Sequence, residues 1–279
     1  MTRAFVTGWP VAHSRSPLIH GHWLSAFGIE GSYEKIAVPP EKAPDFFGAL
    51  PGSGFAGGNV TVPHKETALR AASRLDATAA AIGAVNTLWL EDGTLCGGNT
   101  DAYGFAANLD ALLPGWDGAE DVVILGAGGA ARAVLHAVLD RSRARVRVIN
   151  RTVARAEALA EAFGPRVSGH GEGEQRALLR HADLLVNTVS KDMAKAAGDG
   201  DALPELDSLP DHAMVSDIVY VPLETPLLRA ARLRGLAAAD GLGMLLHQAV
   251  PGFERWFGVR PEVTAALRDL VVSDIERVP

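Results

Sequence analysis

The sequence predicts an α/β fold divided into two domains. Short strand-like runs alternate with helical patterns along the chain, and several of these runs are almost entirely apolar, as in DVVILG and ADLLVN. Strands that are buried on both faces of a sheet show such continuous apolar runs. With 279 residues, of which 48% are hydrophobic, the chain is long enough to bury a substantial core in each of two domains.

The first hundred residues predict one α/β domain, and a second region with a clearer βαβ rhythm follows it. Strand-like runs of the first region cover Ala4 to Gly8, Tyr33 to Val38 and Gly58 to Val62. In the second region the expected strands cover 121–125, 145–150, 183–187 and 213–218, and the expected helices cover 129–140 and 153–163. The longest irregular stretch, Ser190 to His212, is rich in Asp, Gly, Pro and Lys and is interpreted as either a mobile flap or a solvated loop.

The composition excludes several classes of protein. A formal net charge of -7 argues against a nucleic-acid-binding surface. Cys96 is the only cysteine, which excludes an internal disulfide, favours a reducing compartment and is expected to be a small buried apolar residue. The sequence lacks the apolar region of a signal peptide and any stretch of about 18 apolar residues. We therefore expect a cytoplasmic protein without nucleic-acid or membrane partners.

A glycine-rich turn follows strand 121–125 and runs into a helix, as in a dinucleotide-binding fold. Glycines permit a tight turn and close approach to pyrophosphate, a small third residue permits helix packing, and the helix N-terminus offers unpaired N–H groups. Such turns also serve merely as connections, but this one has a strand and a helix on the correct sides. No Gly-Lys-Ser/Thr ending follows, which argues against a phosphate-transfer loop. The predicted nucleotide-binding residues are Gly126, Ala127, Gly128, Gly129, Ala130 and Ala131.

The end of the next strand favours NADPH over NADH. An NAD enzyme places an Asp or Glu there to bind the ribose 2′-hydroxyl, whereas this sequence has Asn150, Arg151 and Thr152. Without a carboxylate to repel a 2′-phosphate, Arg151 and Arg155 can pair with it. The alternative is that both arginines belong to a solvated helix start.

Ser14 and Ser16 stand at an expected helix start, and Ser16 directly precedes Pro17. A serine before a proline is a standard helix cap. Two hydroxyls beside a helix N-terminus also form a good cradle for a carboxylate. The residues alone leave both interpretations open.

The segment NVTVPHK alternates with period two, which predicts that Val60 and Val62 face a core while Asn59 and Thr61 share the opposite face. That polar face points into a cleft or into solvent. Lys65 follows at the mouth of the next helix, where a surface lysine is the common interpretation.

Asn86 in GAVNT and Asp101 in GGNTD stand beside small residues and expected turns, as residues of catalytic loops often do. A helix-capping role is the alternative for Asp101. The nine histidines show no ligand-like spacing, and the sequence predicts no metal site.

Seven motifs occur in the order seen in shikimate dehydrogenases, and the chain resembles that family from end to end: HSRSP, NVTVPHK, GAVNT, GGNTD, GAGGAARA, NRT and GLGMLLHQA. The resemblance implies an N-terminal α/β catalytic domain, a Rossmann-like NADP-binding domain, and C-terminal helices that pack back on the first domain. The implied substrate-binding and catalytic domain covers 1–101 and 242–279, and the NADP-binding domain covers 102–241.

The resemblance also implies an activity, the reversible NADPH-dependent reduction of 3-dehydroshikimate to shikimate in the pathway to aromatic amino acids. The implied cofactor is NADP(H), and the chain is expected to be a monomer or a homodimer. Lys65 and Asp101 would form the catalytic dyad, with Lys65 as proton donor and Asp101 as its orienting partner. Ser14 and Ser16 would hold the substrate carboxylate. The further substrate contacts implied are Asn59, Thr61, Asn86, Tyr220 and Gln248, and the further cofactor contacts are Thr188, Ile218, Gly241 and Met244.

Two positions depart from the family pattern. Asp192 stands where a glycine usually precedes the methionine, and this carboxylate on the nicotinamide side weakens the assignment of Thr188. Trp9 stands where a smaller polar residue is common.

Two other functions are alternatives. A quinate/shikimate dehydrogenase with broader substrate use would prefer NAD, against which the sequence Asn150-Arg151-Thr152 argues. A non-catalytic ligand-binding relative on the same fold would not need to retain both Lys65 and Asp101.

Overall fold

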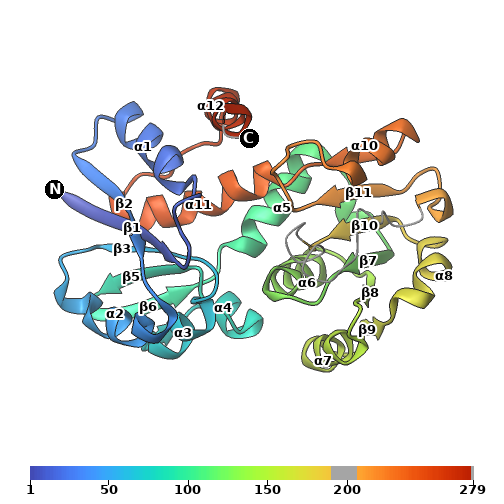
Figure 1. Ribbon diagram of the computed structural model, residues 1–279, viewed down its shortest axis with the longest axis horizontal. Helices are drawn as coiled ribbons and strands as arrows, with labels where there is room; N and C mark the ends of the chain where they lie inside the picture. The colour runs from blue at the N-terminus through green and yellow to red at the C-terminus, as the bar shows by residue number, and fades with distance from the viewer. Residues whose placement is uncertain (190–205, 278–279) are drawn as a thin grey trace. The chain divides into compact units, whose positions relative to one another are not determined.

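The computed structural model describes residues 1–189 and 206–277, and in it the chain forms two compact units (Figure 1). The first unit comprises residues 1–104 and 246–279, and the second comprises residues 105–245. Asp192 and residues 190–205 of the Ser190 to His212 stretch lie outside the described residues. The described part of the stretch contains a 3₁₀ turn, η5 (Leu206–Ser208), with Leu206 and Leu209 buried, and it ends in the exposed residues Asp211 and His212.

The first unit is built on a mixed sheet with the strand order β2-β1-β3-β5-β6-β4. Strand β1 is parallel to both of its neighbours, whereas β5 is antiparallel to β3 and to β6. The strands are β1 (Thr2–Gly8), β2 (Gly31–Ala37), β3 (Gly57–Val60), β4 (Arg74–Leu75), β5 (Thr87–Glu91) and β6 (Thr94–Gly98). The helices within this unit are α1 (Ser16–Ala26), α2 (Ala43–Ala49), α3 (Lys65–Ala71), α4 (Ala77–Ile82) and α12 (Ala265–Arg277). Helices α5 (Asp101–Leu112) and α11 (Leu242–Phe257) each have residues in both units.

A tight hairpin joins β5 to β6. Its turn is Asp92-Gly93, and both residues have positive φ, 52° and 74°. This is the backbone conformation of the two-residue turns that match the twist of antiparallel strands, and Asp-Gly is a favoured sequence for them. The turn fixes the register in which Thr87 pairs with Gly98, so the start of β5 lies beside the end of β6.

The second unit contains a parallel sheet with the strand order β12-β11-β10-β7-β8-β9, and β7, β8, β10 and β11 lie next to one another in Figure 1. Numbered from the first strand of this unit, the order is that of a doubly wound dinucleotide-binding sheet. The strands are β7 (Asp121–Leu125), β8 (Arg145–Ile149), β9 (Val167–His170), β10 (Leu184–Asn187), β11 (Met214–Asp217) and β12 (Ala237–Ala239). The helices within this unit are α6 (Gly129–Arg141), α7 (Val153–Phe163), α8 (Gln175–Leu179) and α10 (Pro226–Leu233).

Each unit has its own hydrophobic core. In the first, Phe5 and Leu88 of the sheet pack with Phe47 of α2. In the second, Val123 and Leu185 of neighbouring strands belong to one buried cluster. Cys96 is buried, as predicted.

The C-terminal helices pack on the first unit, as the resemblance implied. The Trp256 indole N–H donates to the Leu88 carbonyl at 2.9 Å, which ties α11 to β5. Arg15 Nε lies 2.9 Å from Asp274 Oδ2, which ties the start of α1 to α12. Among the described residues, no helix is both long enough and apolar enough to cross a bilayer.

The predicted strands and helices named above are confirmed, but one side-chain orientation is wrong. Val62 is 69% exposed, whereas Val60 is 2% exposed. Strand β3 ends at Val60, and the period of two no longer describes the turn that follows it. The β5–β6 hairpin was not predicted from the sequence.

Candidate active site

Lys65 and Asp101 form a close ion pair in the first unit. Lys65 Nζ donates to Asp101 Oδ2 at 2.6 Å, and the two side chains are 26% and 14% exposed. Partial shielding from water makes such a charge-assisted hydrogen bond stronger than a pair on the open surface. Both side chains keep some exposed area, so a small molecule can reach them.

Asn86 holds the other oxygen of Asp101. Its Nδ2 donates to Asp101 Oδ1 at 2.8 Å, and its Oδ1 accepts from the backbone N–H of Thr100 at 2.8 Å. A backbone N–H can only donate, so the Asn86 amide cannot turn around without losing both bonds. The Asp101 carboxylate is therefore fixed at both oxygens.

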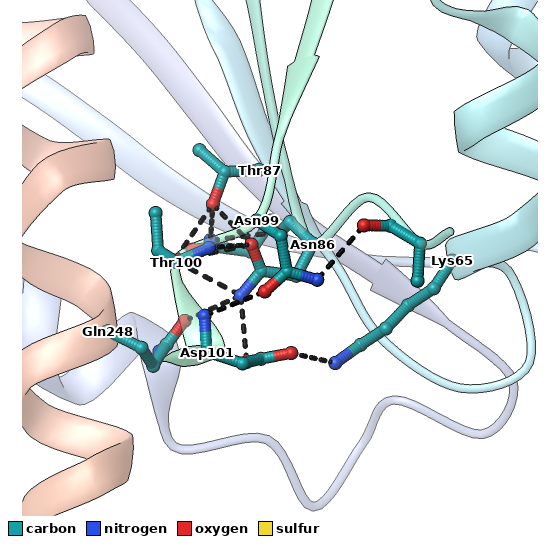
Figure 2. A network of polar contacts seen from close by, with 9 residues as sticks. Lys65, Asn86, Thr87, Asn99, Thr100, Asp101 and Gln248 are labelled. Atoms are coloured by element: carbon teal, nitrogen blue, oxygen red, sulfur yellow. Dashed lines mark hydrogen bonds and ion pairs between the residues drawn. The ribbon is translucent and has the colours of Figure 1, made fainter. Parts of the chain in front are cut away.

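Figure 2 shows the polar side chains that surround Asn86. Thr87 Oγ1 donates to Asn86 Oδ1 at 2.9 Å, and Gln248 Oε1 of α11 accepts from Asn86 Nδ2 at 3.4 Å. The Thr87 and Thr100 hydroxyls lie 3.2 Å apart. A buried network in which these groups have partners is rigid, since each bond restricts the next.

The β5–β6 hairpin explains why these residues meet. Asn86 directly precedes β5, and its N–H donates to the carbonyl of Gly98, the last residue of β6, at 3.0 Å. Thr100 and Asp101 follow β6 by two and three residues. Residues that stand about 15 positions apart in the sequence therefore lie side by side.

Two further bonds place the ion pair. Asn99 Oδ1 accepts from the Asp101 N–H at 3.0 Å at the start of α5, and the Val85 N–H donates to the Lys65 carbonyl at 3.0 Å at the start of α3. Asn99 thus binds the first N–H of the helix. The alternative that Asp101 is a helix cap is wrong, because both of its oxygens bind side chains instead.

Ser14 and Ser16 lie together at the start of α1. The Ser14 hydroxyl accepts from the Ser16 N–H at 3.3 Å and donates to the Ser16 hydroxyl at 3.3 Å. The helix begins at Ser16 itself after Arg15, so Ser16 does not cap it. One hydroxyl in the first turn of an 11-residue helix, and a second just before the helix begins, favour an anionic ligand.

Thr61 and Asn59 lie at the end of β3. The Thr61 N–H donates to the Thr7 carbonyl at 2.8 Å. A Cβ atom at Gly8 would lie 2.4 Å from Thr61 Cγ2, so the absence of a side chain at Gly8 permits this close approach. Asn59 is 5% exposed, and its Nδ2 donates to the Asn86 carbonyl at 3.2 Å.

In the second unit the glycine-rich turn follows β7, the strand from which the sheet extends in both directions. Gly126 has a φ of 97°, and a Cβ there would lie 2.7 Å from Thr188 Oγ1. A Cβ at Gly128 or Gly129 would meet nothing within 4 Å. Helix α6 begins at Gly129 without a side-chain cap, and its 13 residues end at Arg141. Open space beside unpaired helix N–H groups fits a pyrophosphate.

Polar and charged residues follow the end of β8. Asn150 Nδ2 donates to the Thr152 carbonyl at 2.9 Å, and Arg151 and Arg155 are exposed. None of the residues 150–155 is a carboxylate. This donor set fits a 2′-phosphate, which pairs with guanidinium groups.

A buried aspartate anchors the loop that follows β11. Asp217, which is 2% exposed, accepts hydrogen bonds from the Val219 N–H at 3.0 Å, Asn187 Nδ2 at 2.9 Å and the Thr225 hydroxyl at 2.7 Å. Burial raises the pKa of Asp217, and the three donors oppose that shift. Because Val219 and Thr225 stand near opposite ends of residues 218–225, one carboxylate closes this segment into a loop.

Tyr220 lies in that loop and is partly buried, as are Ile218 and Met244. A Cβ at Gly241 would lie 2.1 Å from the Ile218 carbonyl oxygen, so only a glycine permits this close approach. The Thr188 hydroxyl donates to the Leu125 carbonyl at 2.7 Å, which places Thr188 beside the end of β7. Among the described residues, no group of three or more His, Cys, Asp or Glu side chains could hold a metal ion.

These features define a class of protein, a two-unit α/β enzyme with a doubly wound nucleotide-binding sheet in one unit and a Lys–Asp pair in the other. Family models match three parts of the chain. The shikimate dehydrogenase substrate-binding domain matches residues 6–88, the shikimate/quinate 5-dehydrogenase model matches residues 116–196, and the shikimate 5'-dehydrogenase C-terminal domain matches residues 241–269.

Full-length relatives agree with these matches. The shikimate dehydrogenase (NADP(+)) of Brucella canis is 59% identical, over 99% of this chain and 95% of the relative. The enzyme of the same name from Mesorhizobium japonicum is also 59% identical, over 99% of this chain and 98% of the relative. The chain therefore belongs to the shikimate dehydrogenase family, which confirms the resemblance and the predicted class, an NADP-dependent oxidoreductase.

Solved structures confirm the predicted fold class. A Thermus thermophilus shikimate 5-dehydrogenase in complex with NADP(H) and shikimate has a TM-score of 0.83 and 37% identity, and the match covers 99% of each chain. A Corynebacterium glutamicum quinate dehydrogenase in complex with NAD has a TM-score of 0.87 and 29% identity, and the match covers 98% of this chain and 99% of the other.

Several residues that position the site were not predicted from the sequence. Thr87, Asn99 and Thr100 stand beside predicted site residues, and the Asp92-Gly93 turn between two alternating runs was the signal that would have brought them together. Asp217, one residue before the end of the predicted strand 213–218, was also not predicted, and of its three partners only Asn187 lies far away in the sequence.

We expect Asp217→Asn to loosen the loop of residues 218–225. The amide cannot accept from all three donors, and the loss of one hydrogen bond to a charged group corresponds to about a tenfold change in an equilibrium. Amide hydrogen exchange should therefore be about tenfold faster in residues 218–225. Asp183→Asn is the control. It also changes a carboxylate that accepts from backbone N–H groups, but these belong to Glu120 and Asp121, at 2.8 and 2.9 Å. Unchanged exchange in the loop of the Asp217 variant would contradict the anchoring role.

Proposed function

We propose that this chain catalyses the reversible reduction of 3-dehydroshikimate to shikimate with NADPH. The observation that carries the proposal is the Lys65–Asp101 pair, in which one carboxylate oxygen binds Lys65 Nζ at 2.6 Å and the other binds Asn86 Nδ2 at 2.8 Å. A carbonyl that accepts a hydride develops negative charge on its oxygen, and an ammonium group can stabilise and protonate that oxygen.

In this mechanism Lys65 is the proton donor and Asp101 is its orienting partner. When bound, NADPH supplies the hydride. Asp101 holds the Lys65 ammonium group in place, while Asn86 prevents the carboxylate from rotating away. In the reverse direction the same pair accepts the proton from the substrate hydroxyl. Such acid/base assistance is typically worth about 10²- to 10⁴-fold in rate.

The first unit would hold the substrate. Ser14 and Ser16, at the N-terminus of α1, would bind the carboxylate, and Thr61, Asn86 and Gln248 would contact the hydroxyl groups. Asn59 is proposed to act at the same site through its bonded neighbours. Tyr220 would lie between the substrate and the nicotinamide.

The second unit would hold NADP(H). The turn at 126–131 would take the pyrophosphate, Asn150, Arg151, Thr152 and Arg155 would take the 2′-phosphate ribose, and Thr188, Ile218, Gly241 and Met244 would contact the nicotinamide side. The support for this assignment is the open space at Gly128 and Gly129 and the exposed arginines after β8. A cytoplasmic location and a monomeric or homodimeric state complete the proposal.

We expect Lys65→Ala to bind shikimate while its kcat falls about 10²- to 10⁴-fold, because the proton donor is lost but the carboxylate contacts remain. NADP reduction with shikimate, followed by absorbance, measures kcat, and calorimetric titration measures binding. Lys42→Ala, at an exposed lysine of the same unit, is the control. Absence of turnover in the wild type would overturn the proposed function.

We expect Arg151→Ala combined with Arg155→Ala to weaken NADPH binding far more than NADH binding, because only NADPH carries the 2′-phosphate. The two cofactors are compared by KM in steady-state kinetics. The double variant Arg143→Ala with Arg180→Ala removes the same charge from exposed positions of the same unit and should change neither KM. Equal losses for the two cofactors would contradict the assignment.

We expect quinate with NAD to be a poor substrate pair relative to shikimate with NADP. The fold does not decide this, since the quinate dehydrogenase from Corynebacterium glutamicum superposes with a TM-score of 0.87. The residues after β8 support the expectation, because they lack the carboxylate that binds a free 2′-hydroxyl. The kcat/KM values of the two pairs provide the measurement, and a higher value for quinate with NAD would favour the broader enzyme.

A further inference from the structure

Asn59 and Thr87 stand directly opposite each other in the antiparallel pair of β3 and β5. Opposite residues place their side chains on the same face of a sheet, close enough to bond. Asn59 Nδ2 donates to Thr87 Oγ1 at 3.2 Å, and the two residues are 5% and 0% exposed. The register of the sheet thus places a buried amide beside a buried hydroxyl, and that hydroxyl belongs to the residue after Asn86.

The direction of each bond at Thr87 follows from a backbone group. Asn59 Nδ2 lies 3.2 Å from the backbone carbonyl of Asn86, which can only accept, so Asn59 donates to Thr87 as well. The single hydrogen of the Thr87 hydroxyl must then go to another acceptor. Asn86 Oδ1 at 2.9 Å is that acceptor, since its bond from the Thr100 N–H identifies it as the amide oxygen.

The side-chain oxygen of Asn86 is therefore held by two donors, the Thr100 N–H at 2.8 Å and the Thr87 hydroxyl at 2.9 Å (Figure 2). With one donor alone, the amide could turn about that bond and swing its nitrogen away from Asp101. Two donors fix the plane of the amide, and one hydrogen of Asn86 Nδ2 then points at Asp101 Oδ1, 2.8 Å away.

The second hydrogen of Asn86 Nδ2 has only longer contacts. Thr100 Oγ1 lies at 3.1 Å and Gln248 Oε1 at 3.4 Å. This second hydrogen is the one that a substrate hydroxyl can take, so the bond to Asp101 and a contact with the substrate are compatible.

We infer that Thr87 is a positioning residue for the Lys65–Asp101 pair, acting through Asn86. The inference rests on the proposed function of that pair. Thr87 is 0% exposed, so it acts without touching the substrate. Its hydroxyl fixes the Asn86 amide, and the amide fixes the carboxylate that holds the proton donor. A misplaced proton donor slows the chemical step, so the effect is expected in kcat.

The first test is Thr87→Val, which replaces the hydroxyl with a methyl group of similar size. We expect kcat with shikimate to fall about tenfold, the effect of one lost hydrogen bond. The KM for NADP should not change, because the proposed cofactor contacts lie in the second unit. A kcat equal to that of the wild type would overturn the inference.

Thr7→Val is the matched control. Thr7 is also 0% exposed, and its hydroxyl has no hydrogen-bond partner in the part of the chain that the structure describes. It pairs with Val60, the neighbour of Asn59, and so lies on the opposite face of the same sheet. The substitution leaves the backbone carbonyl of Thr7 unchanged. We expect this variant to match the wild type.

Thr87→Ser and Thr87→Ala form a second pair, which decides the question even if the valine variant does not fold. Both lose the methyl group, and they differ only in the hydroxyl oxygen. The serine variant should keep kcat within about threefold of the wild type, whereas the alanine variant should lose about tenfold. Equal kcat values for the two variants would contradict a role of the hydroxyl.

A double-mutant cycle with Asp101→Ala separates positioning from a general disturbance of the fold. Asp101→Ala removes the group at which Asn86 points, so adding Thr87→Val should change the remaining kcat by less than about twofold. A further tenfold loss in the double variant would show that Thr87 does not act through Asp101.

Hydrogen exchange of the Asn86 side-chain amide, followed by NMR, needs no turnover. We expect exchange about tenfold faster in Thr87→Val than in the wild type and in Thr7→Val, because the amide has lost one of its two anchors. Unchanged exchange would overturn the inference. A wild type that does not turn over shikimate would instead overturn the proposed function, and the exchange rates would still decide whether Thr87 fixes Asn86.

Discussion

The orientation of the Asn86 side chain is the constraint on which the Lys65–Asp101 pair depends. The Thr100 N–H fixes the amide oxygen at 2.8 Å, so the amide nitrogen must face Asp101. A free carboxylate can rotate, and a lysine has several rotatable bonds, so an exposed pair would lose most of its energy to side-chain entropy. Here the side-chain entropy is lost when the hairpin forms, before any substrate binds. The ion pair is thus a product of the register of β5 and β6.

The sequence predicted the second unit better than the first. Parallel strands buried on both faces appear as apolar runs, which need no knowledge of distant residues. The first unit has a mixed sheet, and its antiparallel hairpin depends on the Asp92-Gly93 turn, which was not predicted from the sequence. The alternation of apolar and polar residues also gave the wrong orientation for Val62, because a period of two says nothing about where the strand ends. The proposed roles of Lys65 and Asp101 came from ordered motifs, since a lysine at a helix start is uninformative alone.

Both units hold their candidate sites with buried polar side chains that have their bonds satisfied. Asp217 takes three donors in the second unit, and Asn59 uses both amide hydrogens in the first. Such groups stabilise a fold only modestly, but a partner removed from one of them leaves a buried polar atom unpaired. Their effect is therefore on geometry, since alternative arrangements of the loop or the strand would each leave one atom unsatisfied.

Substrate and cofactor selection reside in short segments that the fold does not determine. A quinate dehydrogenase with bound NAD and a shikimate dehydrogenase with bound NADP(H) superpose on this chain with TM-scores of 0.87 and 0.83. Backbone similarity of that degree cannot separate the two activities. The difference must come from side chains, and in this chain the proposed ones are the arginines after β8 and the serines at the start of α1.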